Sequence, residues 1–552
     1  MSTLGTREYQ MFPVLDAAQM ETASRFASGP ARAFAPNELA YAIGEQGAPA
    51  WLVLAGTIHV TRRDGLSREA VVTVHGVGQL SGEVNQLSGR PSMANGRAGP
   101  DGCTALPFDA AHLRALMVGS AEVGEIVMRA LILRRVGLIE EGGAGTILIG
   151  IPGSPDITRI QGFLTRSGYP NLVLDAASDE EGKALVERIG VQPDELPLIV
   201  CPSGSILKRP SNAEVAACLG MTPDLDPEML YDVAIVGAGP AGLAAAVYAA
   251  SEGLSVIVLD ERAMGGQAGA SARIENYLGF PTGISGQALA GRAFNQALKF
   301  GAEIAIPLEV MRLDCGYEGG PGDPLALELP GDRRIRSRTV IIASGARYRR
   351  PDIPNLAMFE GAGISYWASP IEAKLCAGEE VALVGGGNSA GQAVVFLAPR
   401  VKRLHLIVRR DLSATMSRYL IDRIAALPNV TVHVGTEIAG LEGDAASGLK
   451  AAIFRNRADG STDRRALRHI FLFIGADPNA GWLQDCVETD GKGFVVTGRS
   501  TLPLETSRGG VFAIGDVRAG STKRVAAAVG EGAAVVAQIH IALAKRAPPE
   551  TG

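Results

Sequence analysis

Residues 231–242 decide the fold, and they read Tyr231-Asp232-Val233-Ala234-Ile235-Val236-Gly237-Ala238-Gly239-Pro240-Ala241-Gly242. The apolar run before the first glycine predicts a strand, and the alanine-rich segment after the last glycine predicts a helix. The glycines permit a tight turn and let the backbone approach a pyrophosphate, whose charge a helix N-terminus favours. A second strand, 254–259, ends at Asp260 and Glu261, where an acid suits the ribose of a dinucleotide. The stretch therefore predicts a dinucleotide-binding βαβ unit.

A second glycine-rich turn follows the apolar run 380–384 and reads Gly385-Gly386-Gly387-Asn388-Ser389-Ala390. At the offset where the first copy has its acid, this copy has Val408, followed by Arg409 and Arg410. Guanidinium groups favour a 2′-phosphate, which a carboxylate would repel. The pattern predicts NADPH rather than NADH; the alternative is a solvated strand end. The predicted nucleotide contacts of this copy are Gly385, Gly387, Asn388, Ser389, Ala390, Arg409 and Arg410.

Length and composition indicate the number of domains and disfavour some classes of protein. A chain of 552 residues suggests three or four domains. The 52 basic and 58 acidic side chains give a formal net charge of −6, which disfavours a nucleic-acid-binding role. No sufficiently long apolar stretch predicts a membrane span. Glycine, at 69 residues, is abundant, as expected if the chain contains many tight turns.

The cysteines are scattered through the chain. The six are Cys103, Cys201, Cys218, Cys315, Cys376 and Cys486. They form no CxxC and no zinc-ligand spacing, so we expect no metal site. We also expect reduced thiols and a cytoplasmic location.

Turn-forming residues divide the chain near 140–145 and 220–227. Short apolar runs before the first division, followed by a helical stretch near 109–138, predict an antiparallel β-roll with helices over 1–140. Alternating strands and helices over 145–220 predict a small α/β unit. After the second division, alternation continues to the end, which predicts doubly wound α/β sheets.

Further motifs follow in a fixed order, and with them residues 231–543 resemble the low-molecular-weight thioredoxin reductases. The motifs are Gly265-Gly266-Gln267, Ile274-Glu275-Asn276-Tyr277, Ile341-Ile342-Ala343-Ser344-Gly345-Ala346, Gly510-Val511-Phe512-Ala513-Ile514-Gly515-Asp516-Val517 and Lys523-Arg524-Val525-Ala526-Ala527-Ala528. The resemblance implies an FAD-binding domain over 231–350 and 475–545, an NADPH-binding domain over 351–474, and a homodimer. FAD contacts are then expected at Gly237, Gly239, Pro240, Ala241, Gly242, Asp260, Glu261, Gly266, Gln267, Asn276, Ala343, Gly345, Gly515, Asp516, Arg524, Val525 and Ala526.

The chain departs from this family at the position of the redox-active cysteines. Where the family has its redox CxxC, this chain has Trp367 and Pro370. A relay from flavin through that cysteine pair is therefore not expected. Trp367 or its neighbour Tyr366 is a candidate to cover the flavin face, and simple packing is the alternative. Cys376 is the nearest thiol, either redox-active or buried and inert.

Two resemblances concern the N-terminal part. Residues 145–220 resemble a thioredoxin or glutaredoxin fold, with 151–156 where the CxxC belongs but without its cysteines, and with Pro197 where a cis-proline is expected. Residues 1–138 resemble a cyclic nucleotide-binding β-roll, with a phosphate-binding-like segment near Gly82 and Glu83. Ser92 stands where its arginine belongs, and neither Arg90 nor Arg97 has the right spacing. A cyclic nucleotide, another small ligand or partner, and a purely structural role remain open.

Together these features favour an FAD-dependent NADPH oxidoreductase. Hydride transfer between cofactors needs no catalytic side chain, so none is assigned. The acceptor is unidentified: a ferredoxin, a quinone, oxygen, another small molecule, or a thioredoxin-like protein. The alternatives are an NADPH-dependent thioredoxin-disulfide reductase and a flavin-based redox sensor regulated through the N-terminal domains.

Overall fold

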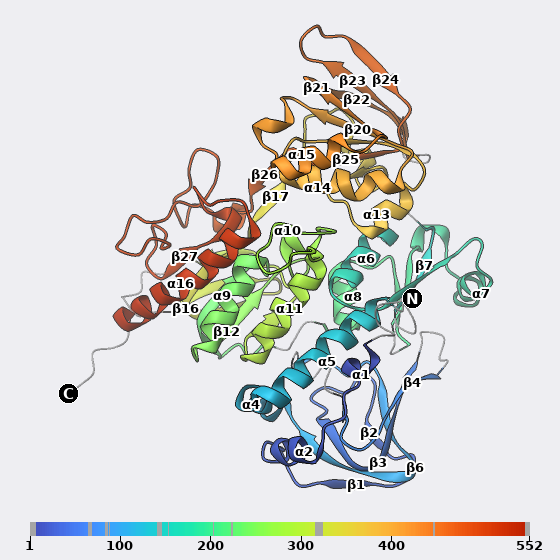
Figure 1. The fold of residues 1–552 in the computed structure, drawn as a ribbon, viewed down its shortest axis with the longest axis vertical. Helices are drawn as coiled ribbons and strands as arrows, with labels where there is room; N and C mark the ends of the chain where they lie inside the picture. The colour runs from blue at the N-terminus through green and yellow to red at the C-terminus, as the bar shows by residue number, and fades with distance from the viewer. Residues whose placement is uncertain are drawn as a thin grey trace.

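The computed structural model describes residues 7–546, apart from 64–68, 83–86, 88, 141–145, 153, 202–203, 222–224, 315–323 and 445–447. Four units follow one another along the chain (Figure 1). The N-terminal β-rich unit and a small α/β unit lie beside a pair of larger α/β domains. The predicted divisions at 140–145 and 220–227 fall partly outside the described residues.

The first unit is one antiparallel sheet with helices. Its strand order is β1-β6-β3-β4, with β2 on β6 and β5 on β3. The bounds are α1 Glu8–Met11, α2 Ala17–Ser24, β1 Arg32–Phe34, β2 Leu39–Tyr41, β3 Ala50–Arg63, β4 Glu69–His75, β5 Leu80–Ser81, β6 Asn95–Phe108, α4 Ala110–Gly119 and α5 Ala121–Glu140. Asp109 caps α4 by accepting from the His112 amide, so the helix begins directly after β6. Leu52, Phe108 and Leu113 are fully buried between sheet and helices.

The second unit has a four-stranded sheet of order β10-β9-β7-β8, in which β7 and β8 are parallel. Its bounds are β7 Thr146–Gly150, α6 Pro155–Arg166, β8 Asn171–Asp175, α7 Glu180–Ile189, β9 Leu198–Val200, β10 Ile206–Lys208 and α8 Asn212–Cys218. The Leu196–Pro197 peptide bond before β9 is cis. Helix α6 buries Ile157, Ile160 and Phe163 against the sheet.

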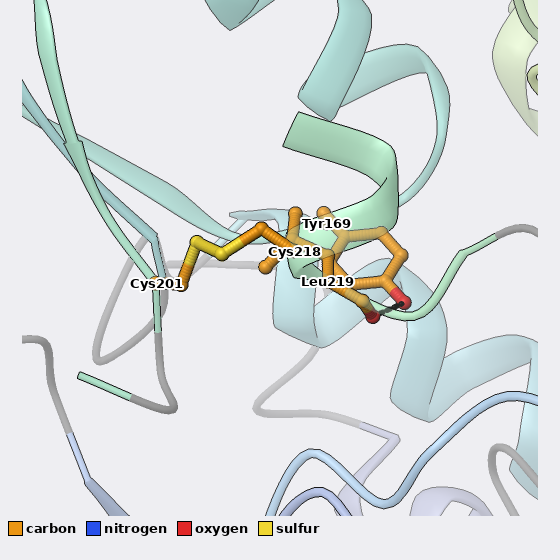
Figure 2. The surroundings of a disulfide bond; sticks show 4 residues. All are labelled: Tyr169, Cys201, Cys218 and Leu219. Atoms are coloured by element: carbon orange, nitrogen blue, oxygen red, sulfur yellow. Dashed lines mark hydrogen bonds between the residues drawn. A yellow bond between two sulfur atoms is a disulfide. The ribbon is translucent and has the colours of Figure 1, made fainter. Parts of the chain in front are cut away.

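A disulfide joins Cys201, just after β9, to Cys218 at the end of α8, beside Tyr169 and Leu219 (Figure 2). Cys486 is also disulfide-bonded. The expectation of reduced thiols is therefore wrong for these cysteines. Spacing along the chain showed no pair because the fold, not the sequence interval, brings the end of β9 to α8. The cytoplasmic location, which rested on reduced thiols, stays a prediction.

The third unit is the first doubly wound domain. Its sheet has the order β13-β12-β11-β16-β15-β14, with β27 on β16, and β11 is parallel to both β12 and β16. The bounds are β11 Leu230–Val236, α9 Pro240–Ser251, β12 Val256–Leu259, α10 Gly266–Gly269, α11 Gly286–Lys299, β13 Glu303–Ala305, β14 Arg312–Asp314, β15 Leu325–Leu329, β16 Arg333–Ile342, β27 Val511–Ala513 and α16 Val525–Arg546. The predicted βαβ unit at Gly237 is confirmed, since β11, α9 and β12 follow one another around it.

In the part of the chain that the structure describes, one helix, Val525–Lys545, is long and apolar enough to cross a membrane by length and composition alone. This differs from the expectation that no segment reaches that length. Its residues Val535, Val536 and Ile539 are buried in the same core as the first βαβ unit. A Cβ at Gly532 would lie 2.5 Å from the Ala241 carbonyl oxygen, so α16 packs closely on α9. This packing buries 33% of the apolar window and so accounts for part of its apolar sequence.

The fourth unit is the second doubly wound domain, and its five strands β18-β25-β19-β20-β21 are all parallel. The bounds are α12 Leu356–Phe359, β18 Ile364–Ser365, α13 Pro370–Leu375, β19 Glu380–Val384, α14 Asn388–Leu397, β20 Arg403–Val408, α15 Arg418–Ala425, β21 Val430–Val434, β22 Thr436–Asp444, β23 Gly448–Asn456, β24 Thr462–Arg465 and β25 His469–Leu472. Strands β17 (Ala346–Tyr348) and β26 (Ala476–Pro478) pair where the chain passes between the two large domains. The prediction of two doubly wound domains is confirmed.

Candidate functional site

A cavity of about 830 Å³ lies at the carboxyl ends of β11 and β12 and extends to helix α14 of the second domain. Open α/β sheets bind ligands at this edge. Many of the residues singled out in the sequence meet here: Gly237, Gly239, Pro240, Ala241, Asp260, Glu261, Gly266, Gln267, Asn276, Ala343, Gly345, Trp367, Asn388, Ser389, Gly515, Asp516, Arg524, Val525 and Ala526. The two glycine-rich motifs therefore border one continuous space.

Three glycines make the first turn. Gly237 has a φ of +115°, and a Cβ on it would lie 2.2 Å from the Ala343 carbonyl oxygen. A Cβ on Gly242 would lie 1.9 Å from the Gly237 carbonyl oxygen, so this glycine serves the packing of α9 rather than the cavity wall. Gly239 caps α9 and has nothing within 4 Å of its Cβ position. The space in front of a helix N-terminus is thus left open, which fits the phosphates of a dinucleotide.

The two acids after β12 have different environments. Asp260 accepts hydrogen bonds from the backbone amides of Ala238 and Arg262, both at 2.8 Å. Burial raises its pKa, and these amides act in the opposite direction. Glu261 pairs with the Arg262 guanidinium at 2.7 Å and is 39% exposed. Asp260 therefore fixes the glycine-rich turn, and Glu261 is the more accessible acid in the wall.

The far end of the cavity carries the late aspartate. Burial raises the pKa of Asp516, which lies beside the start of α16. Gly515 has a φ of +72°, and its amide donates to Glu531 at 2.6 Å. Lys523 donates to the Asp516 backbone carbonyl oxygen. This loop holds a carboxyl group and a helix N-terminus at one end of a long cavity, an arrangement suited to a sugar hydroxyl and an anionic ring.

The two aromatic candidates for the flavin face point in different directions. Trp367 lines the cavity, and its Nε1 donates to Glu372 at 2.9 Å. Tyr366 stacks on Tyr348, with ring centres 6.2 Å apart, and its hydroxyl donates to Glu360. Of these two tyrosines, Tyr348 lines the cavity. Trp367 therefore faces the cavity, whereas Tyr366 does not line it and packs on Tyr348.

Cys376 is a poor nucleophile in this position. Its side chain is fully buried, and burial raises its pKa to about 11. Its Sγ lies 3.9 Å from the Ala373 carbonyl oxygen. The cavity wall, as the described residues form it, includes none of Cys201, Cys218 and Cys376. Within the described ranges, no group of three or more His, Cys, Asp or Glu is arranged to hold a metal ion.

The second glycine-rich turn is built like the first. Gly385 has a φ of +143°, and a Cβ there would lie 2.3 Å from the Phe473 carbonyl oxygen. Asn388, at the start of α14, accepts from the Ser417 amide at 2.7 Å. Arg409 and Arg410 are exposed after β20, and no carboxylate of the described chain is paired with either. They lie outside the cavity wall together with Gly385, Gly387 and Ala390.

Sequence reasoning missed several wall residues. Arg166, Tyr348, Phe396, Phe473 and Trp482 also line the cavity. None belongs to a motif with its own local signature. Arg166 comes from the small α/β unit, so only the tertiary arrangement reveals it.

The β-roll segment near Gly82 lies in a different part of the molecule. A Cβ on Gly82 would lie 3.3 Å from the Tyr41 ring, and Glu83 lies outside the described residues. The Arg90 guanidinium lies 5.6 Å from the Tyr169 ring centre and 5.8 Å from that of Phe294. Arg90 thus contacts both the small α/β unit and the first doubly wound domain.

Comparison with known proteins agrees with this geometry. The profile of the family described as pyridine nucleotide-disulphide oxidoreductase matches residues 231–532. The NADPH-dependent thioredoxin reductase 3 of Arabidopsis thaliana is 33% identical over 310 residues, covering 55% of this chain and 57% of that protein. The thioredoxin reductase of Treponema pallidum is 34% identical over 303 residues, covering 55% of this chain and 94% of that protein.

Two further comparisons extend this result. An alkyl hydroperoxide reductase component of Pseudomonas putida is 34% identical over 315 residues, covering 55% of this chain and 56% of that protein. The chain thus spans little more than half the length of its longer relatives. Among solved structures, the thioredoxin reductase of T. acidophilum superposes with a TM-score of 0.52 at 28% identity, covering 57% of this chain and 99% of that one.

Proposed function

The chain belongs to the pyridine nucleotide-disulphide oxidoreductase family and is an FAD-dependent NADPH oxidoreductase, and from this premise we propose that its electrons leave the flavin without an internal redox disulfide. The observation that carries the proposal is that Trp367, which the sequence resemblance aligns with the family's cysteine pair, lines the cavity wall. A tryptophan side chain cannot form or break a disulfide. The acceptor therefore has to meet the flavin itself.

The chain's own residues bind and orient the cofactors. Bound FAD supplies the two-electron chemistry between NADPH and the acceptor. The α9 N-terminus at Gly239 favours the diphosphate, and Glu261 is placed for a ribose hydroxyl. The start of α16, beside Asp516, supplies positive potential at the far end of the cavity. Arg409 and Arg410 favour the 2′-phosphate of NADPH over the 2′-hydroxyl of NADH.

The described disulfide does not replace the missing cysteine pair in this proposal. Cys201 is fully buried and Cys218 partly so, both in the small α/β unit. Cys376 is kept protonated by burial at neutral pH, because its pKa is raised to about 11. Electron transfer to a ferredoxin, a quinone or oxygen needs none of these sulfurs.

The second candidate function is NADPH-dependent reduction of a thioredoxin-like disulfide. It is favoured by the names of the relatives, which are thioredoxin reductases and a component of an alkyl hydroperoxide reductase. In this chain, the disulfide of the partner would have to reach the flavin directly. The third candidate is a redox sensor, in which the flavin is reduced once and the N-terminal units pass the change to a partner.

An acceptor screen separates the three functions. Protein reduced anaerobically with NADPH is mixed with oxidised thioredoxin, ferredoxin, a quinone or oxygen, and flavin reoxidation is followed by absorbance. We expect continuous turnover with a non-disulfide acceptor, unchanged in a Cys201→Ser, Cys218→Ser double variant. Turnover with thioredoxin alone favours the second function, and a single reduction without turnover favours the sensor.

The remaining assignments are part of the same proposal. Residues 1–140 form a cyclic nucleotide-binding-like β-roll, and 145–220 a thioredoxin-like unit without the motif cysteines. Calorimetric titration with cyclic AMP and cyclic GMP tests the β-roll, and light scattering tests the homodimer. We place the protein in the cytoplasm, which fractionation of cells expressing the full chain would test.

A further inference from the structure

We propose that Arg166, supplied by the small α/β unit, binds a phosphate group of a dinucleotide held in the large cavity. Among the described residues that line this cavity, Arg166 is the only one that precedes Val236 in the sequence. It is the last residue of α6, a helix outside both doubly wound domains. The small unit would then be part of the cofactor site.

Contacts at both ends hold α6 against the two large domains. The Thr165 carbonyl oxygen accepts from Gln287 Nε2 on α11 at 2.9 Å. At the other end, Pro155 lies 3.6 Å from the Cβ position of Gly361 in the second domain. Figure 1 shows α6 next to α13, the helix that follows Trp367. Arg166 is therefore placed at the cavity by packing on both sides.

The guanidinium itself is oriented by two contacts. Its Nε donates to the Gly162 carbonyl oxygen at 3.1 Å, and its carbon lies 5.7 Å from the centre of the Trp367 ring. These contacts leave the two terminal nitrogens without a hydrogen-bond partner in the described chain. A guanidinium stacked on an aromatic ring keeps its in-plane N–H groups available for a bidentate anion.

The charged groups around Arg166 do not include a carboxylate that pairs with it among the described residues. Burial and the charge of Arg262 lower the pKa of Arg166, while Glu372 and Asp260 act in the opposite direction. Yet no carboxylate in the described ranges lies within ion-pair distance of Arg166. Glu372 already accepts from Trp367 and Ser369, and Asp260 accepts from the Ala238 amide of the glycine-rich turn. A partly buried cation without a counter-ion is costly, and a ligand phosphate would remove that cost.

FAD and NADPH both carry a diphosphate, so the test has one arm for each. FAD affinity is measured on apo-protein by quenching of flavin fluorescence, and NADP⁺ affinity on the FAD-loaded protein by calorimetry. Arg166→Met keeps the aliphatic packing on Trp367 and removes the charge. We expect it to weaken one of the two affinities by about 10- to 100-fold, the value of a charge-assisted hydrogen bond. Arg166→Lys should restore part of that loss.

The control is Arg188→Gln, which removes one charge from an exposed position on α7 of the same unit. A fall in FAD affinity assigns Arg166 to FAD, and a fall in NADP⁺ affinity assigns it to NADPH. Both affinities unchanged in a folded Arg166→Met protein would overturn the proposal. Should that variant not fold, phenylglyoxal modification of the wild-type chain, mapped by mass spectrometry, gives an independent answer. Modification of Arg166 that neither FAD nor NADP⁺ slows also overturns it.

This inference rests on the cofactors and not on the acceptor. The binding measurements need no turnover. They therefore test the role of Arg166 even if the proposed route of electrons to the acceptor is wrong.

Discussion

Glu275, in the loop of the first doubly wound domain, forms an ion pair with Arg423 on α15 of the second domain. The two side chains are 148 residues apart and join the two domains, which the β17–β26 pair also connects. Glu275 is 19% exposed and Arg423 49%. The pair therefore stabilises one relative orientation of the two doubly wound domains.

Breaking this pair should alter flavin reduction. Partly exposed ion pairs contribute about 0.2–1 kcal/mol, so Glu275→Gln and Arg423→Gln should each change the rate of flavin reduction by NADPH about one- to fivefold. Both variants remove the Glu275–Arg423 pair, and Glu275→Gln also removes a pair with Arg273 at 3.6 Å, so the double variant should change the rate no further than Glu275→Gln alone. Stopped-flow absorbance measures the rate. Arg418→Gln, which breaks a pair within α15, is the control. Additive effects of the two single variants would contradict the coupling.

Two glycines of the first turn should respond differently to alanine. Gly237→Ala forces a Cβ against the Ala343 carbonyl oxygen at a φ of +115°, so it should destabilise the folded protein by more than about 1 kcal/mol. Gly239→Ala has open space and a φ of −73°, so its fold should be intact. Its methyl group projects into the cavity, and FAD affinity should fall. Thermal unfolding of the apo-proteins and FAD titration measure the two effects. Equal losses of stability would refute this distinction.

Local sequence signals predicted the parts of the fold that are locally determined. The turn at Gly237 needs a positive φ and close backbone approach. Glycine permits both because it has no Cβ, so the residue type alone indicates the turn. Asp260 was predicted beside the ligand, but its bonds to backbone amides depend on how the turn folds back over β12. The position of the acid was thus predictable, and the division of roles between Asp260 and Glu261 was not.

Contacts between residues that are distant in the sequence could not be predicted from local motifs. Cys201 and Cys218 have no motif spacing, and they meet because α8 returns to the end of β9. Arg166 has no nucleotide-binding signature, and it reaches the cavity because α6 packs between two domains. Tyr366 was predicted as a neighbour of Trp367, whereas Tyr348, which stacks on Tyr366, is the member of this pair that lines the wall. Each of these relationships depends on packing between distant segments.

Nucleotide preference should depend on the two arginines after β20. Arg409→Gln with Arg410→Gln removes both charges that face a 2′-phosphate in our proposal. The loss of charge-assisted hydrogen bonds should raise the KM for NADPH about 10- to 100-fold, with a much smaller change for NADH. Flavin reduction rates over a range of each nucleotide give both values. Arg418→Gln is again the matched control, because Arg418 is exposed on the same domain and paired with Asp422. An unchanged ratio for the two nucleotides would show that these arginines are only a solvated strand end.

The β-roll should lose stability in mild acid because of His75. This side chain is 3% exposed, and burial, together with the charge of Arg134, lowers its pKa to about 3. In the unfolded chain, its pKa is about 6.5. Since the folded state resists protonation, the stability contributed by neutral His75 is fully present above pH 6.5. It falls by up to about 1.4 kcal/mol per pH unit from there toward pH 3.

Hydrogen exchange of peptides from residues 69–82, followed by mass spectrometry between pH 7.5 and 5, tests this dependence locally, which suits a multidomain chain that need not unfold in one step. After correction for the intrinsic exchange rate, protection should decrease as the pH falls. His75→Phe keeps a ring in contact with Phe12, whose ring centre lies 5.9 Å from that of His75, and has no proton to gain. Its protection should therefore vary little over the same range. His75→Phe removes only the titrating group at this position. If its protection fell with pH as much as that of the wild type, another group would have to cause the acid sensitivity.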